Sequence, residues 1–290
     1  MQVNQIQIKT KDDREVFSLH ERDGVSWLSS SSFDQLPGIH MAIATRFGGV
    51  SEGMYSTLNF SVSQGDDPAR VRENFIRFGR AIGLPAEQMV LSQQTHTTNL
   101  RYCSVEDGGK GILRERGYTD IDGLYTDHNG VGLVISFADC VPVFLADPVK
   151  RVVAAVHSGW RGTVGRIGMK MVRIMSDRFG CDPQNIHALI GPSICQDCYE
   201  VDEPVITRFK NEYSQDQWPL LFGQSDEQIR TGHCQLDLWQ AARLNLLEAG
   251  VDDQHITVTN LCTCCNPDLI FSHRATGGRR GVTVGVIFMQ

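Results

Sequence analysis

The stretch FADCVPVFLADPVKRVVAAVHSGWRG, residues 137–162, holds two apolar runs on either side of a short polar segment. That segment, Asp147-Pro148-Val149-Lys150, suits a type I turn, which favours Asp at its first position and Pro at its second. Each apolar run has the length of a buried strand. The pattern therefore predicts a β-hairpin in the core of the fold.

Two reactive side chains stand in this hairpin. If Asp147 faces Lys150 across the turn, Cys140 faces His157, and an odd-length loop would shift that register. Directly opposed residues share one face of the sheet, with Cβ atoms about 4.5–5.5 Å apart. A thiol and an imidazole at that distance can bind zinc, or can act as a nucleophile and its base. His157 ends its strand just before a Gly-rich turn, which favours a functional site over a buried structural pair.

A zinc ion in an enzyme usually has three protein ligands and leaves a fourth position to water or substrate. His96 is the candidate third ligand, because it ends another predicted strand, MVLSQQTH in residues 89–96. The remaining histidines outside the C-terminal SHR segment lie in loop-like segments and are expected to be solvated: His20, His40, His128, His187, His233 and His255.

Strand and helix patterns alternate along the chain. Helices are predicted over residues 67–83, where Asp67 is the N-cap and Pro68 the first helical residue, over 163–180 with Thr163 as N-cap, and over 236–250. Strands are predicted near residues 41–45, 89–96, 186–190, 256–262 and 282–288. The mixture predicts an α/β fold of α+β character: a single domain over residues 1–290 with a mixed sheet.

Composition narrows the classes of partner. The net charge of -7 gives no reason to expect nucleic acid or an anionic membrane as a partner. The polar segment of residues 1–9 does not resemble a signal peptide, and no stretch approaches the length of a membrane span. A cytoplasmic protein is expected. The nine cysteines are an odd number in a long chain, so a disulfide framework is not expected.

Several further residues are candidates for anion or metal binding. The Gly-rich segment SGWRGTVG, residues 158–165, precedes a predicted helix, and Arg161 adds a guanidinium suited to phosphate or carboxylate. Arg46, just before Gly48 and Gly49, could act similarly. The remaining cysteine clusters, CQDC and CTCC, could form a four-cysteine zinc site. The first has the spacing CxxC, but the second, taken as CxC, lacks zinc-ribbon spacing. Most of these residues are therefore expected to be structural or incidental thiols: Cys195, Cys198, Cys262, Cys264 and Cys265.

These motifs together resemble the YfiH family, also called the laccase-domain or polyphenol oxidase family. The resemblance rests on TRFGGVSEGMYSTLNFS, QTH, DGLYTD, ADCVPVFLAD, VAAVHSGWRG, IGPSICQDCYEV, LDLWQAARLNLLEAGV and SHRATGGRRG, in family order from about Thr45 to the C-terminus. The first forty residues match less well. The chain departs from the family's usual tail, since Ala275-Thr276 stand where a second arginine and an acidic residue often follow.

The resemblance implies the family's own fold, similar to the catalytic domain of the cytotoxic necrotizing factor toxins. It implies a zinc ion, with copper as the alternative metal, held by His96, Cys140 and His157. It implies phosphorolysis of adenosine, inosine and methylthioadenosine, and deamination of adenosine. Some members are described instead as peptidoglycan editing factors. Multicopper oxidation is not expected, because it needs several coppers and the chain contains no His-x-His pair.

The leading hypothesis is a zinc-dependent purine nucleoside enzyme whose small-molecule partners are purine nucleosides and phosphate. Arg46, Cys140 and His157 are the expected catalytic residues, with Arg46 helping the Gly159–Gly162 turn to hold phosphate. The expected substrate contacts come from Asn59, Gln94, Arg161 and His273. One alternative is a cysteine hydrolase or amidase acting on peptidoglycan precursors, with Cys140 as nucleophile and His157 as base. The other is a zinc-binding partner protein whose metal is structural, which the open fourth ligand position argues against.

Overall fold

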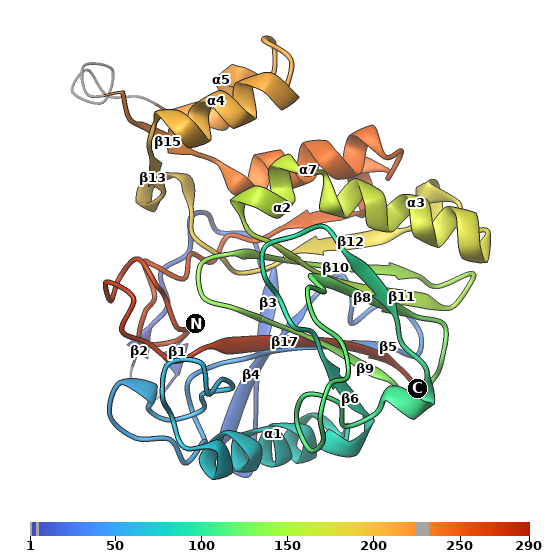
Figure 1. The fold of residues 1–290 in the computed structure, drawn as a ribbon, viewed down its shortest axis with the longest axis vertical. Coiled ribbons are helices and arrows are strands. Elements are labelled where there is room, and N and C mark those ends of the chain that lie inside the picture. The colour runs from blue at the N-terminus through green and yellow to red at the C-terminus, as the bar shows by residue number, and fades with distance from the viewer. Residues whose placement is uncertain (1, 4–5, 224–231) are drawn as a thin grey trace.

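The computed structural model of this chain describes residues 2–3, 6–223 and 232–290. Within these ranges, two six-stranded mixed sheets lie face to face, and helices cover both outer faces (Figure 1). The α/β class with mixed sheets is the class that the sequence predicts. No helix in the described ranges is long and apolar enough to cross a membrane.

The first sheet has the order β3-β4-β5-β17-β9-β6, and the second has the order β16-β12-β10-β11-β8-β7. The first comprises β3 (Phe17–Arg22), β4 (Val25–Ser30), β5 (Ile39–Ala44), β17 (Thr283–Met289), β9 (Gly132–Phe137) and β6 (Met89–Leu91). The second comprises β16 (Ile256–Val258), β12 (His187–Ile190), β10 (Val141–Asp147), β11 (Val152–Ser158), β8 (Gly123–Thr126) and β7 (Leu100–Tyr102).

Short strands and helices complete the described chain. The strands are β1 (Gln2–Val3), β2 (Ile6–Gln7), β13 (Glu200–Val201), β14 (Phe222–Gly223) and β15 (Cys234–Leu236). The helices are α1 (Pro68–Ile82), α2 (Trp160–Val164), α3 (Ile167–Phe179), α4 (Glu203–Glu212), α5 (Trp218–Leu221) and α7 (Leu238–Glu248). Helix α1 packs on the first sheet, and α3 and α7 pack on the second.

The layer between the two sheets is an apolar core. Phe144 and Val153 of the second sheet belong to the same buried cluster as Ile43 and Leu133 of the first. Gly285 of β17 lies where a Cβ atom would come within 2.4 Å of Phe144 Cζ. A glycine is therefore required at this position for the Phe144 ring to fill the space between the sheets.

Helix α1 confirms the predicted caps. Asp67 is its N-cap and accepts a hydrogen bond from the Ala69 backbone N–H, Pro68 is its first residue, and Gly83 ends it in the left-handed conformation at φ 77°. Helix α7 matches the prediction over 236–250 closely, with Asp237 as its N-cap. In both helices local capping and apolar periodicity agree with the tertiary fold.

The predicted helix over 163–180 is divided in two, and its predicted N-cap is wrong. Helix α2 begins at Trp160 after Gly159, and α3 begins only after Arg166, which takes a positive φ of 60°. Thr163 lies inside α2, where its hydroxyl approaches the hydroxyl and carbonyl oxygens of Ser158. Helix α2 has only five residues, so an anion at this turn would depend on the Arg161 side chain more than on a helix dipole.

Replacement of Gly285 by alanine tests the contact between the sheets. We expect Gly285→Ala to lower the free energy of unfolding by about 1–3 kcal/mol, because the added methyl overpacks against Phe144. Urea denaturation measures the change. The double variant with Phe144→Leu should lose less than the sum of the two single variants, and strict additivity would contradict this contact.

Candidate active site

Cys140 and His157 occupy one face of the hairpin formed by β10 and β11, but the predicted register is wrong by two residues. Asp147 pairs with Val152, so Pro142 faces His157 and Cys140 lies just before β10. The turn has four residues because Pro148 cannot adopt the positive φ that a tight two-residue hairpin turn requires. Side chains alternate with a period of two along a strand, so this shift leaves Cys140 and His157 on the same face.

Asp122, immediately before β8, holds His157 in place. Its side chain is fully buried, and one carboxylate oxygen lies 2.8 Å from His157 Nδ1. The backbone adds a second link, since the His157 N–H donates to the Asp122 carbonyl oxygen at 2.7 Å. With Nδ1 bound to a carboxylate, Nε2 is the imidazole nitrogen left to meet a metal or an acid–base partner.

The same carboxylate shapes the loop that carries His96. It accepts hydrogen bonds from the backbone N–H groups of Thr95, His96 and Thr97 at 2.8–3.1 Å. His96 adopts a positive φ of 64°, a conformation that a histidine rarely takes without such support. The predicted place of His96 at the end of a strand is wrong. Strand β6 ends at Leu91, and His96 lies in the loop that follows it.

These constraints bring the three predicted metal ligands together. One ligand atom from each of His96, Cys140 and His157 lies within 4.8 Å of the other two, and Cys140 Sγ lies 3.8 Å from His96 Nε2. Gly159 permits this approach, because a Cβ atom there would lie 2.9 Å from the His96 ring and 3.0 Å from Cys140 Sγ. Two imidazoles and one thiolate form a donor set suited to zinc or copper.

The electrostatics of the group favour a charged Cys140. Burial raises the pKa of the Cys140 thiol, but the charge of His157 and hydrogen bonds from both histidines outweigh this and lower it to about 6. Burial lowers the pKa of His157, whereas the Cys140 thiolate and the Asp122 carboxylate raise it to about 9. Without a metal, the pair is therefore a thiolate and an imidazolium at neutral pH.

His96 and Cys140 open into a cavity of about 270 Å³. Two aromatic side chains, Trp160 and Tyr199, form part of its wall. Burial raises the pKa of the Tyr199 hydroxyl, so this group stays protonated and can donate a hydrogen bond. The other lining residues are Ala138, Asp139, Arg161, Ile194, Leu238, His273, Arg274 and Arg280.

The cavity gathers three arginines, of which only Arg161 was expected. Arg161 stacks on Trp160 with its guanidinium carbon 4.4 Å from the ring centroid. Arg274 donates to the carbonyl oxygens of Cys198 and Glu200, and Arg280 donates to that of Gly281. The buried Arg280 Nε has no partner among the described residues. A cluster of arginines beside a Cys/His group suits an anionic ligand.

Three residues with predicted roles in catalysis or substrate binding lie elsewhere. Arg46 stacks on Phe271, and its guanidinium donates to the Ser56 and Pro267 carbonyl oxygens. Asn59 is fully buried and binds the Asp66 carboxylate and the Val282 N–H. Gln94 bonds both ends of its amide to the Ser136 backbone. Their placement outside the cavity does not support substrate contact, and each instead fixes a loop.

Asp122 and the arginines at 274 and 280 carry no predicted role. Asp122 opens the quoted motif DGLYTD, and an acidic residue directly before an apolar strand is the signal that could have indicated it. Arg274 and Arg280 both belong to SHRATGGRRG, where His273 was chosen. His273 does line the cavity, as do Arg161, His96 and Cys140.

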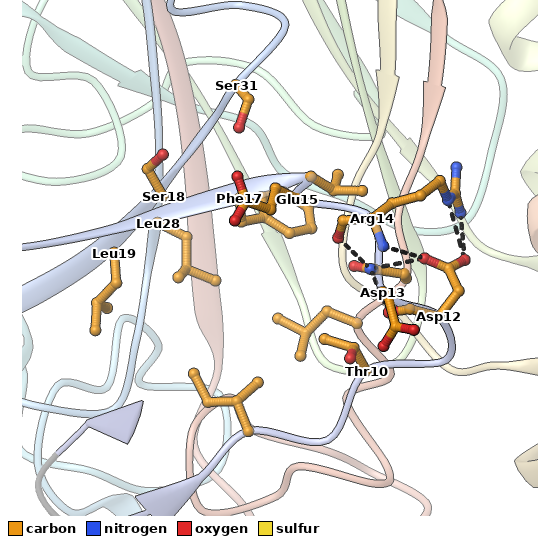
Figure 2. Close-up of a pocket in the computed structure, with 14 residues that line it drawn as sticks. Thr10, Asp12, Asp13, Arg14, Glu15, Phe17, Ser18, Leu19, Leu28 and Ser31 are labelled. Carbon is orange, nitrogen blue, oxygen red and sulfur yellow. Dashed lines mark hydrogen bonds and ion pairs between the residues drawn. The ribbon is translucent and has the colours of Figure 1, made fainter. Parts of the chain in front are cut away.

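A larger cavity of about 630 Å³ lies elsewhere, beneath the N-terminal segment (Figure 2). Within it, Asp12 pairs with Arg14 at 2.8 Å and also accepts a hydrogen bond from Asn260. None of its described lining residues is a histidine or a cysteine. The smaller cavity is therefore the candidate active site, because it alone of the two is lined by histidine and cysteine side chains.

The low pKa of Cys140 is testable by alkylation of the metal-free protein. We expect iodoacetamide to label Cys140 with a rate that rises through a midpoint near pH 6, because only the thiolate reacts. Asp122→Asn should move the midpoint upward, since it removes the charge that stabilises the His157 cation. Peptide mass spectrometry measures the labelling, with buried Cys103 as the internal control. A wild-type midpoint near the ordinary thiol value of about 8.5 would contradict the ion pair.

Comparison with known proteins places this geometry in a family. Residues 40–290 match the model of the family described as multi-copper polyphenol oxidoreductase laccase. "Purine nucleoside phosphorylase YlmD" of Geobacillus stearothermophilus is 34% identical over 264 residues, which cover 91% of this chain and 94% of that protein. "Adenosine deaminase RL5" of an unknown prokaryotic organism is 33% identical over 242 residues, covering 81% and 88%.

Solved structures agree with these matches. The crystal structure of YlmD from Geobacillus stearothermophilus superposes with a TM-score of 0.87 at 34% identity, over 95% of this chain and 99% of that one. The structure of the Bacillus licheniformis hypothetical protein YfiH gives a TM-score of 0.86 at 31% identity, over 94% and 99%. Sequence, fold and motif order agree, and this chain belongs to the multi-copper polyphenol oxidoreductase laccase family that includes the YfiH and YlmD proteins.

Proposed function

We propose that this chain is a metal-dependent enzyme acting on purine nucleosides, by phosphorolysis of adenosine, inosine and methylthioadenosine and by deamination of adenosine. One observation carries the proposal: the His96, Cys140 and His157 group opens into a cavity that also holds arginines and aromatic rings. The names of the relatives, purine nucleoside phosphorylase and adenosine deaminase, support it.

The three side chains fit a catalytic zinc, because they supply three ligands and a cavity beside them for a fourth. Copper is the alternative, since two histidines and one cysteine also suit that metal. Bound here, zinc would polarise a substrate oxygen or lower the pKa of a bound water to about 7. Asp122 would act through His157, by keeping Nδ1 engaged and Nε2 directed at the metal.

The cavity walls suit a nucleoside. A volume of about 270 Å³ is at the small end for ligand pockets, which matches a base joined to one sugar. Trp160 can stack on a planar purine, and the Tyr199 hydroxyl can donate to one of the purine nitrogens. His273, which is exposed at the wall, is positioned to contact the sugar or the base.

The arginines suit the second substrate of phosphorolysis. Phosphate carries two or more acceptor oxygens for guanidinium donors. Arg161 makes no hydrogen bond to another described side chain or carbonyl, and Arg280 has an unpartnered Nε, so both have donors free for an anion. Arg274 uses donors on two carbonyls and so is held rigidly beside them. We assign phosphate binding to this set rather than to Arg46, which lies outside the cavity.

The ion pair between Cys140 and His157, considered without a metal, favours a second candidate function. Asp122, His157 and Cys140 lie in the order of an acid, base and nucleophile triad, with a thiolate already formed at neutral pH. That arrangement suits a cysteine hydrolase or amidase acting on peptidoglycan precursors. The two functions differ in whether Cys140 is bound to metal, because a coordinated thiolate is a poor free nucleophile.

The proposed function is tested by product analysis of the purified, metal-loaded protein incubated with adenosine, with and without phosphate. We expect adenine and ribose 1-phosphate only when phosphate is present, and inosine in both cases. Cys140→Ala and chelator treatment should each abolish all three products. Absence of every product in the metal-loaded wild type would overturn the proposal. Cleavage of an amide substrate that survives chelation and is lost in Cys140→Ala would favour the hydrolase.

The phosphate role of Arg280 predicts a selective defect. We expect Arg280→Met to reduce phosphorolysis roughly ten- to a hundredfold, mainly through a raised KM for phosphate, because a charge-assisted contact is lost. Deamination needs water rather than phosphate and should change much less. Arg279→Met is the matched control, because Arg279 is next to Arg280 in the chain but its side chain is exposed and does not line the cavity. Equal losses in both reactions would contradict a phosphate contact.

A further inference from the structure

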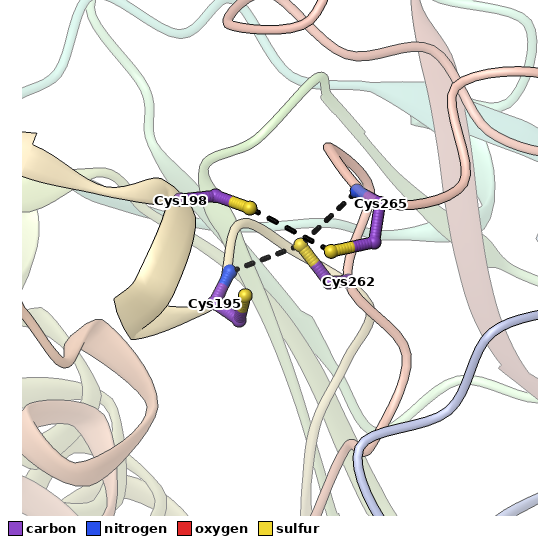
Figure 3. Close-up of side chains that lie close together, drawn as sticks. All are labelled: Cys195, Cys198, Cys262 and Cys265. Carbon is purple, nitrogen blue, oxygen red and sulfur yellow. Dashed lines mark hydrogen bonds between the residues drawn. The ribbon is translucent and has the colours of Figure 1, made fainter.

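Four cysteine side chains meet outside the candidate active site. Cys195, Cys198, Cys262 and Cys265 direct their sulfurs toward one point (Figure 3), and all four sulfurs lie within 4.8 Å of one another. Cys198 and Cys265 are 67 positions apart along the chain, yet their sulfurs are 3.6 Å apart. Cys195 and Cys198 have the spacing CxxC. Cys262 and Cys265 have the same spacing, and Cys264 is not part of the cluster.

Sheet topology explains why the two pairs meet. Strands β12 and β16 are parallel neighbours, so the loops that follow them leave the second sheet at the same edge. The first loop carries Cys195 and Cys198, and the second carries Cys262 and Cys265. A bridge between Ser193 and Cys262 continues the parallel pairing up to the cluster.

We propose that these four cysteines bind one zinc ion as a closed structural site. A tetrahedral zinc with Zn–S bonds of about 2.3 Å places its sulfurs about 3.8 Å apart, close to the 3.6 Å between the sulfurs of Cys198 and Cys265. Four thiolates complete the coordination and leave no position for water, which is typical of structural rather than catalytic zinc. The inference is independent of the proposed nucleoside activity.

Backbone donors face one sulfur of the cluster. The backbone N–H groups of Cys195 and Cys265 both donate to Cys262 Sγ, at 3.3 and 3.4 Å. Such donors stabilise a ligating thiolate, as hydrogen bonds to the ligands do in other metal sites. Zinc with four thiolates carries a net charge of -2, and the Lys11 ammonium, paired with Asp197 at 2.7 Å, lies at the edge of the cluster to offset part of it.

The geometry does not suit the two other common uses of clustered cysteines. All nine cysteines are free, and a sulfur separation of 3.6 Å is far longer than a disulfide bond of about 2.05 Å. An iron–sulfur cluster spreads its cysteines over several iron atoms, so it needs a wider cage than four sulfurs within 4.8 Å. A single ion is the group that fits.

The site would fix one wall of the active-site cavity. Thr263, inside the second CxxC, donates to the Asp139 carboxylate at 2.6 Å, next to Cys140. The Cys198 carbonyl oxygen accepts from Arg274 at 3.1 Å, and the next residue, Tyr199, lines the cavity. A zinc ion that locks both loops therefore holds in place the residues around Cys140 and the Arg274 guanidinium.

Metal analysis of protein purified under reducing conditions tests the proposal. In Cys140→Ala, which damages the other candidate centre, we expect about one zinc per chain to remain after gel filtration with chelator. Adding Cys265→Ser should remove most of it, whereas adding Cys264→Ser, the matched control, should not. Cobalt substituted into the Cys140→Ala protein should give the intense visible bands of tetrahedral cobalt with four thiolates.

A measurement on the wild type covers the case in which Cys265→Ser fails to fold. The four thiols should resist alkylation in the native protein and become reactive once zinc is removed by chelator in denaturant. The proposal would be overturned if Cys140→Ala protein, as purified, contained no zinc and its four thiols reacted at once under native conditions. Two disulfides among the four in protein purified without oxygen, or iron in place of zinc, would overturn it equally. Loss of nucleoside activity with this zinc retained would instead count against the proposed function alone.

Discussion

The buried carboxylate of Asp122 is the constraint on which the candidate active site depends. Its two oxygens accept hydrogen bonds from the His157 ring, from three consecutive backbone N–H groups and from the Thr97 hydroxyl. A buried charge is tolerated only when it is fully compensated, so these partners cannot shift independently. The carboxylate thereby joins β8, β11 and the His96 loop at one point. The positive φ of His96 is a consequence of that junction.

The two-sheet architecture supplies the platform for this junction. Strands β10 and β11 lie in the middle of the second sheet, covered on one face by the first sheet and on the other by α3 and α7. Such burial leaves the hairpin little freedom, and Cys140 enters at its open end. Gly159 then permits the close contact of thiolate and imidazole that a side chain would prevent. Rigidity of this kind suits a preorganised metal centre.

Much of this could be predicted from the sequence because it depends on local patterns. The hairpin follows from the turn residues between its strands, and the caps of α1 follow from capping preferences. The shared face of Cys140 and His157 follows from the period of two along a strand. The register shift did not change the face, because a slip of two residues preserves side-chain direction. His96 was chosen correctly as a neighbour of Cys140, although its support comes from Asp122 rather than from a strand end.

The remaining features depend on contacts between distant segments, which no local pattern encodes. Arg46 and Asn59 are polar residues in Gly- and Ser-rich loops. Only the fold shows that Arg46 donates its hydrogen bonds to backbone carbonyls and that Asn59 donates to Asp66. Arg280 reaches the cavity from a different segment than Cys140. The second CxxC lies within CTCC, where three cysteines allow three different pairs, and only the parallel strands β12 and β16 select one of them.

The proposed metal centre of His96, Cys140 and His157 lies beside the candidate active-site cavity and can be located directly. The measurement is anomalous diffraction at the zinc edge, on crystals grown with zinc and soaked with inosine. We expect an anomalous peak within bonding distance of all three side chains, with nucleoside density beside it. A fully occupied nucleoside with no metal peak among these three side chains, or a peak beyond bonding distance of Cys140, would contradict the proposed centre.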